Sequence, residues 1–210
     1  MTEFQVNTYT IGNQSNSTVA IDADGDFVIS WISSGQNGSA FGIYAQRYNS
    51  AGVAQGGEFK VNTYTSSFQY NPRVAMDAAG DFVISWQSYG QDGSDNGIYA
   101  QRYNSAGVAV GDEFKVNTYT TNSQSNPTVA IDADGDFIIS WTSNGQDGSR
   151  SGIYAQRYNS AGVAQGGEFL VNTYTNNNQV NPTVAMDATG DFVISWHMVR
   201  TDLGRAYMPN

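Results

Sequence analysis

The most constraining feature of the chain is a segment that it repeats letter for letter. GIYAQRYNSAG stands at residues 42–52 and returns at 97–107 and 152–162. GDFVISW begins at 25, 80 and 190, with GDFIISW at 135, and EFxVNTYT begins at 3, 58, 113 and 168, so every step is 55 residues or a multiple of it. A fixed period of this kind indicates one supersecondary unit stacked on copies of itself.

Each repeat contains four short segments with strand character, which in the first copy are 17–22, 26–31, 43–49 and 58–62. Apolar and polar residues alternate with period 2 along them, and no segment shows helical spacing. The connections D-A-D-G and N-S-A-G place Gly where a tight hairpin needs a left-handed residue. The repeat therefore predicts a four-stranded antiparallel unit.

Four-stranded units at this period are typical of β-propeller blades. We expect an all-β fold, a β-propeller of four four-stranded antiparallel blades, closed by the N-terminal strand Glu3–Asn7, which would complete the last blade. An eight-bladed ring made by two chains that exchange end strands, and a β stack that is not a propeller, stay open as alternatives. The chain is expected to form a single domain, 1–210, with repeats circularly permuted relative to the blades, at about 3–57, 58–112, 113–167 and 168–210.

The charge balance excludes several classes of partner. Asp and Glu outnumber Lys and Arg 19 to 9, which gives a net charge of −10. Such a chain cannot neutralise a run of phosphates, so no nucleic acid is expected as a partner. No apolar run is long enough to insert into a membrane. The chain has no Cys, which excludes disulfides and thiolate metal sites.

The repeated sequence motifs resemble those of two known groups of proteins. The pattern P-x-V-A-x-D-x-x-G-D-F-V-I-S-W followed by I-Y-A-Q-R-Y-N-S-A-G is similar to NHL-type propeller blades. GQDGS, GIYAQRYN and EFxVNTYT resemble tandem repeats of large bacterial secreted or surface proteins of the RTX-like, "calcium-binding" kind. This resemblance implies a secreted or cell-surface location, and the start MTEFQVNTYT shows no signal peptide.

The longer connections between strands are the expected binding face. The G-Q-[DN]-G-S loops and the NTYT segments should gather at one end of the blades, where amides, hydroxyls and aromatic rings can hold glycans or cell-surface polymers. The residues expected to bind a ligand are Tyr64, Gln91, Asp92, Tyr119, Gln146, Asp147 and Tyr174. Calcium is the one cofactor considered, with Asp92, Asp95 and Asp147 as its ligands, because carboxylates suit a hard cation.

Catalysis finds little support in the residues. The one His is His197, in the divergent segment 197–210, and fourfold repetition multiplies every other candidate. We therefore expect no enzyme, but a non-catalytic repeat module for binding or structural spacing, with glycan binding through the long-loop face. A calcium-stabilised adhesive scaffold and an amplified repeat propeller without ligand are the alternatives. The expected assembly is a monomer or a strand-exchanged homodimer.

Overall fold

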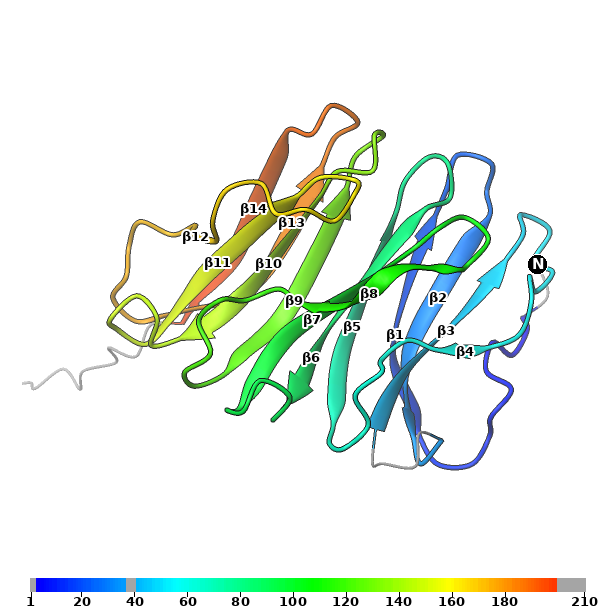
Figure 1. The fold of residues 1–210 in the computed structure, drawn as a ribbon, viewed down its shortest axis with the longest axis horizontal. Helices are drawn as coiled ribbons and strands as arrows, with labels where there is room; N and C mark the ends of the chain where they lie inside the picture. Colours follow the sequence, from blue (N-terminus) through cyan, green and yellow to red (C-terminus); the bar gives the residue numbers. More distant parts are fainter. Residues whose placement is uncertain (1–2, 37–40, 200–210) are drawn as a thin grey trace, which may run out of the picture.

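The computed structural model describes residues 3–36 and 41–199, and these fold into strands and turns without a helix (Figure 1). No helix able to cross a membrane occurs among them. The divergent residues 200–210, in which the third strand of the last repeat was expected, lie outside the described part. The strands are β1 (Gln14–Ile21), β2 (Phe27–Ser34), β3 (Phe41–Tyr48), β4 (Phe59–Lys60), β5 (Gln69–Met76), β6 (Phe82–Tyr89), β7 (Asn96–Tyr103), β8 (Ala109–Lys115), β9 (Gln124–Ile131), β10 (Phe137–Asn144), β11 (Ser151–Tyr158), β12 (Phe169–Leu170), β13 (Asn178–Met186) and β14 (Phe192–Val199).

The strands form repeated antiparallel sheets, which we call blades. Blade 1 has the order β1-β2-β3-β4 and blade 2 the order β5-β6-β7-β8. Blade 3 contains β9, β10, β11 and β12, and blade 4 contains β13 and β14. A single parallel pair, Ser151 with Asn178, joins the sheets of blades 3 and 4. The expected all-β fold of repeated four-stranded antiparallel units is confirmed.

The hairpin between the first two strands of a blade is built by its own Asp and Gly. In blade 1 the Asp22 carboxylate accepts the backbone N–H groups of Asp24 and Asp26, both at 2.9 Å. Gly25 has φ +85°, a conformation that L side chains rarely adopt. These are local interactions, which explains why the turn could be predicted from D-A-D-G.

Hydrophobic cores lie between blades. The face of β6 that carries Phe82, Ile84 and Trp86 packs toward blade 1, against Val28 and Ile32. The next interface repeats this arrangement one blade further along. Trp86 and Trp141 are fully buried, and aromatic rings of that size contribute a large part of the buried apolar area.

The first strands of the blades, β1, β5, β9 and β13, lie side by side and carry an irregularity at the same position. Each has a register shift against its partner strand. Asn16, Asn71, Asn126 and Asn181 adopt positive φ there, between 49° and 56°. Their side chains form a ladder across the blades, from Asn16 Nδ2 to Asn71 Oδ1 (3.4 Å), Asn71 Nδ2 to Asn126 Oδ1 (3.1 Å) and Asn126 Nδ2 to Asn181 Oδ1 (2.9 Å).

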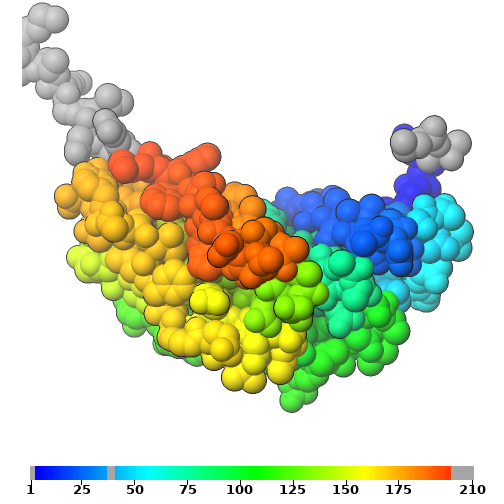
Figure 2. Space-filling model, turned by 90° about the horizontal axis from the view of Figure 1, so that it is seen from above, coloured from blue at the N-terminus to red at the C-terminus, as the bar shows by residue number. Residues whose placement is uncertain are grey.

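The blades form an open arc (Figure 2), and the expected closure by the N-terminal strand is not found. The first strands neighbour one another in the order β1, β5, β9 and β13, and Figure 1 shows blades 2 and 3 between blade 1 and blade 4. Residues 3–7 form no strand and do not pair with β14. They lie instead against blade 1, where the Tyr48 hydroxyl donates to Val6 O at 3.1 Å. The described residues contain no closed sheet because the segment that was expected to complete blade 4 is held at the far end of the arc.

Candidate functional site

The predicted long loops do lie beside one another. Tyr89 N donates to Phe68 O at 3.0 Å, which joins the end of β6 to the segment before β5. The side chain of Asn96 donates to the Ser123 hydroxyl at 3.0 Å, which joins the loop of blade 2 to the segment leading into blade 3. The second contact thus ties the long-loop region of blade 2 to the segment that enters blade 3.

Gln91 and Gln146 are engaged by the protein itself. Gln91 Nε2 donates to Glu113 Oε1 at 2.5 Å, and Gln146 donates to Glu168. The other oxygen of Glu113 accepts the backbone N–H of Thr63 at 2.6 Å. Each glutamate thus links the loop of its own blade to the segment arriving from the preceding blade, which is a structural function.

Asp92 and Asp147 occupy equivalent places in blades 2 and 3. One carboxylate oxygen of each accepts a backbone N–H, from Ser94 at 3.1 Å and from Ser149 at 2.9 Å. The other oxygen, Oδ2, is buried and has no hydrogen-bond partner among the residues that the structure describes. In blade 2 this carboxylate lies against Tyr99, whose pKa is raised first by burial and then by Asp92 and Glu113.

The predicted calcium ligands do not form one cluster. Asp92 and Asp147 are in different blades, and the Asp95 carboxylate accepts from the Asn96 side chain at 3.2 Å. No group of three or more His, Cys, Asp or Glu able to hold a metal ion occurs in residues 3–36 and 41–199. Calcium binding by these three residues stays a prediction.

The predicted tyrosines are tied to the blades through their backbones. The carbonyls of Tyr64 and Tyr119 accept from Asn62 and Asn117, both at 2.8 Å, and that of Tyr174 accepts from Asn172 at 3.0 Å. Tyr174 is 47% exposed. Their part in ligand binding stays a prediction.

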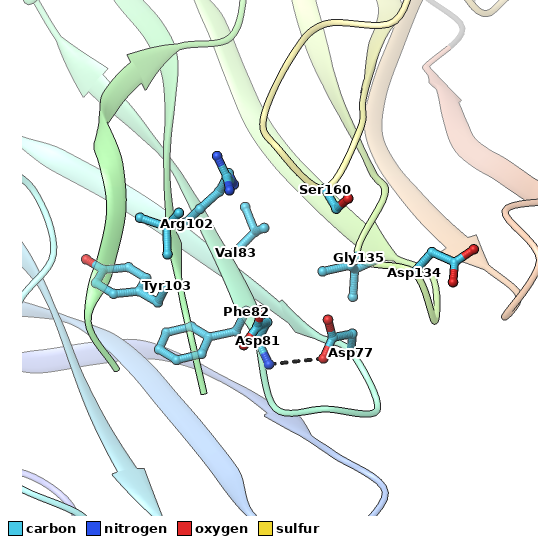
Figure 3. A pocket seen from close by; sticks show the side chains of 11 residues that line it. Asp77, Asp81, Phe82, Val83, Arg102, Tyr103, Asp134, Gly135 and Ser160 are labelled. Carbon is cyan, nitrogen blue, oxygen red and sulfur yellow. Dashed lines mark hydrogen bonds between the residues drawn. The ribbon is translucent and has the colours of Figure 1, made fainter. Parts of the chain in front are cut away.

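The opposite end of the blades carries small charged pockets. Between blades 2 and 3, Arg102, Asp77, Asp81 and Ser160 surround a cavity of about 110 Å³ (Figure 3). Arg102 Nη1 donates to Ala161 O at 2.5 Å. Burial lowers the pKa of Arg102, and Asp81 acts in the opposite direction.

The pocket between blades 1 and 2 repeats this arrangement, with a cavity of about 130 Å³. Both volumes fall below the range of about 300–1,000 Å³ that is usual for ligand sites. These pockets are therefore too small for a sugar, and we interpret their charged residues as inter-blade contacts.

A larger groove crosses the first strands of blades 2, 3 and 4. Its cavity is about 460 Å³, within the usual range for ligand sites. The groove is lined by Arg73, Val74, Asn126, Pro127, Thr128, Val129, Asn181, Pro182, Thr183 and His197. The Asn126–Asn181 step of the ladder forms part of its wall, and Arg73, Thr183 and His197 are exposed on it. We call this site the inner groove.

The inner groove could not be recognised in the sequence because its residues come from three different repeats. The signal in the sequence is the Asn-Pro pair that lies within the first strand of three blades, at 71–72, 126–127 and 181–182. His197, which was set aside as part of a divergent end, is the one imidazole of the groove.

Comparison with known proteins identifies structures with a similar fold but does not assign the chain to a family. No family model matches the chain, and no curated protein matches it. The resemblance to RTX-like and NHL-type repeats is therefore without support from sequence comparison, as are the expectations of calcium binding and secretion.

Solved structures do share the fold. An endo-arabinase from Bacteroides thetaiotaomicron superposes with a TM-score of 0.53 at 19% identity, over 92% of this chain and 74% of that one. The α-L-arabinofuranosidase of Fusarium graminearum, solved with arabinobiose, gives 0.59 at 13% identity, over 90% of this chain and 61% of that one. A protein of unknown function from Dyadobacter fermentans gives 0.64 at 9% identity, over 89% and 62%. The chain thus spans less than two thirds of the length of the last two.

The fold is that of β-propeller-like glycoside hydrolases, with repeated four-stranded blades. This finding corrects the expectation of a non-catalytic binding or spacing module. That expectation rested on fourfold repetition, and the solved structures show that blades of this kind form the scaffold of carbohydrate-active enzymes. Repetition of the scaffold is therefore no argument against an enzyme.

Proposed function

We propose that this chain forms part of a carbohydrate-active β-propeller and that its inner groove binds a glycan. The observation that carries the proposal is the chemistry of the groove wall. Asn126, Asn181, Thr128 and Thr183 bring amide and hydroxyl groups to a cavity of about 460 Å³. Sugars present hydroxyl groups that both donate and accept hydrogen bonds, and such side chains can satisfy both.

The apolar part of the lining supports the same proposal. Val74, Val129 and two proline rings lie beside the polar groups, and sugar rings have apolar C–H faces as well as hydroxyls. Ligand sites commonly combine an apolar lining with a few polar groups that fix orientation. Arg73 adds a cationic group that can donate two parallel hydrogen bonds.

The fold comparison points to the same class of ligand. One of the enzymes that share the fold was solved with arabinobiose, which makes this disaccharide the first probe. Hydrolysis of a glycosidic bond commonly uses two carboxyl groups flanking it, whereas the ten residues that line the groove include none. We therefore assign binding to the groove, and hydrolysis is measured alongside it.

The test is calorimetric titration of the chain with arabinobiose and a panel of neutral and acidic oligosaccharides, with product analysis by chromatography. Arg73→Ala and Thr183→Ala should each weaken binding of the preferred sugar by about 10-fold, as loss of one or two hydrogen bonds predicts. Arg157→Ala is the matched control, because Arg157 is exposed on β11 and does not line the groove. Binding that survives both groove variants, or no binding by any sugar, would overturn the proposal.

A further inference from the structure

The last blade of the arc exposes a face that every other blade buries. Val193 on β14 is 72% exposed. The residues at the same position of the other blades, Val28, Val83 and Ile138, are between 0% and 2% exposed. They are buried because the following blade packs on them: Val28, for example, belongs to one core cluster with Ile84 and Trp86 of blade 2. Among the described residues, blade 4 therefore presents an uncovered copy of an established interface.

The first blade exposes the opposite face of the same interface. Val19 on β1 is 62% exposed, whereas Val74, Val129 and Val184 at the same position are 7% or 8% exposed. Ile21 is 63% exposed beside it. A cavity of about 370 Å³ on this side is lined by Ile29, Trp31 and residues 4–7. Ile29 is half-buried, whereas its counterpart Ile84 in blade 2 is fully buried.

The N-terminal segment already lies where the outer strand of a preceding blade would lie. The rings of Phe4 and Tyr48 are 5.2 Å apart and tilted by 53°. Phe59 of the blade 1 outer strand has the same relationship to Tyr103 of blade 2, at 5.3 Å and 54°. Thr8 N donates to Glu58 at 2.8 Å, as Thr63 N does to Glu113. Blade 1 thus presents a docking face with its outer strand in place.

The polar contacts between blades have a direction. Along the Asn ladder each amide nitrogen donates to the next blade, ending at Asn181. Asn126 N donates to Gln87 of the preceding blade, and Asn181 N donates to Thr142, both at 3.1 Å. His197 stands at the position of Gln87 and Thr142. An acceptor at the end of blade 4 therefore matches the Asn16 N–H at the start of blade 1.

We propose that the occupant of both faces is a second copy of this chain, docked head to tail. Blade 4 of each copy packs on blade 1 of the other, with Val193 against the Val19 and Ile21 face. Residues 3–7 of the receiving copy serve as the outer strand of the docked blade. The two contacts are identical, so two copies close a ring with twofold symmetry.

The number of copies follows from the number of blades. The four blades formed by the described residues leave the arc open. Propellers typically contain 4 to 8 blades, so two copies with eight blades complete a ring within that range, and three copies would exceed it. The same residues that stabilise the interfaces inside the chain then stabilise the interface between chains.

The test combines light scattering after size-exclusion chromatography with a pair of end variants. The unmodified protein should have twice the 22.7 kDa mass of a single chain. Val19→Asp and Val193→Asp should each raise the dimer dissociation constant by about 100-fold or more, because each buries an unpaired carboxylate in the contact. Val108→Asp is the matched control: Val108 is 59% exposed in a turn of blade 2 and should leave the mass unchanged.

Mixing the two end variants distinguishes head-to-tail contact from misfolding. The mixture retains one intact contact, blade 4 of the Val19→Asp chain on blade 1 of the Val193→Asp chain, so dimers should reappear. A monomeric unmodified chain, or assemblies that grow beyond two copies, would overturn the ring. A Val19→Asp chain that stays dimeric while Val193→Asp is monomeric would show a face-to-face contact instead. Arg73→Ala leaves both end faces intact, so the failure of glycan binding and the failure of this ring are separately visible.

Discussion

The ring of Phe4 packs on the ring of Tyr48 with centroids 5.2 Å apart, and Phe114 packs on Tyr158 at 5.3 Å. Phe4 belongs to no strand, whereas Phe114 lies in β8, the outer strand of blade 2. The same contact therefore forms with and without a sheet around it. Ring packing on Tyr48 and the hydrogen bonds of Val6 O and Thr8 N with blade 1, rather than strand pairing, position residues 3–8.

Removal of this ring tests how firmly the N-terminal segment is held. Phe4→Ala should lower the free energy of unfolding by about 1–2 kcal/mol, since an aromatic pair adds about 0.5–1.5 kcal/mol to the area that it buries. Phe4 is 50% exposed, so the loss stays below that of a fully buried ring. Urea unfolding measures the change. Val53→Ala, at an exposed turn position, is the control and should have no measurable effect.

The Asn ladder gives a second prediction. Asn126 holds φ +53° and is bonded on both sides. Asn126→Gly removes the ladder contacts but tolerates the backbone conformation, whereas Asn126→Ala also forces an L side chain into it. The Ala variant should be less stable than the Gly variant by about 1 kcal/mol. Thermal unfolding decides between them, and equal stabilities would show that the backbone conformation relaxes.

The pKa of the first Asp of the hairpin turn is shifted in opposite directions in blades 2 and 4. Burial raises the pKa of Asp77, whereas backbone N–H groups and the Thr189 hydroxyl lower the pKa of the exposed Asp187. For Asp187 the stabilisation is present above its unfolded pKa and is lost as the pH falls through the lower folded value. For Asp77 the burial of a charged carboxylate destabilises the folded state. This destabilisation is absent below the unfolded pKa and is complete once the pH has risen through the higher folded value.

Replacing each of these two Asp residues by Asn should therefore change the free energy of unfolding in opposite directions. Asp187→Asn should lose stability at neutral pH, and Asp77→Asn, which keeps the oxygen that accepts from Ala79 and Asp81, should gain stability there. Unfolding free energies measured from about pH 3 to about pH 7 give the comparison. Parallel pH profiles for the two variants would contradict the assigned burial.

Comparing Ala substitutions at two glycines distinguishes the cost of backbone strain from that of a steric clash. Gly162 and Gly166 have similar φ values, +78° and +74°. A Cβ at Gly162 would lie 2.5 Å from Arg102 Nη1, whereas a Cβ at Gly166 would meet nothing within 4 Å. Both Ala variants should lose about 1–2 kcal/mol to the left-handed conformation. Gly162→Ala should lose more, because Arg102 must leave its hydrogen bond to Ala161 O, and chemical unfolding measures the difference.

The sequence indicated which polar side chains repeat, but not which distant residues they contact. Gln91 and Gln146 were recognised as a repeated polar pair at the long-loop face, and the structure places them there. Their partners, Glu113 and Glu168, were missed because each lies 22 residues further along the chain. The inner groove was missed for the same reason, since Arg73 and His197 meet only through the stacking of blades.

The sequence alone determined the unit: four short strands, their turns and the faces that they bury. Those features depend on local conformation and on alternation with period 2, which each 55-residue repeat carries in full. The tertiary structure decided how the units stack, that the arc of described blades stays open, and that residues 3–8 lie on blade 1. Stacking depends on the rotation between neighbouring blades, which is set by the packing of side chains such as Val28 against Trp86. No period in a sequence specifies that rotation, because it results from contacts between residues far apart in the chain.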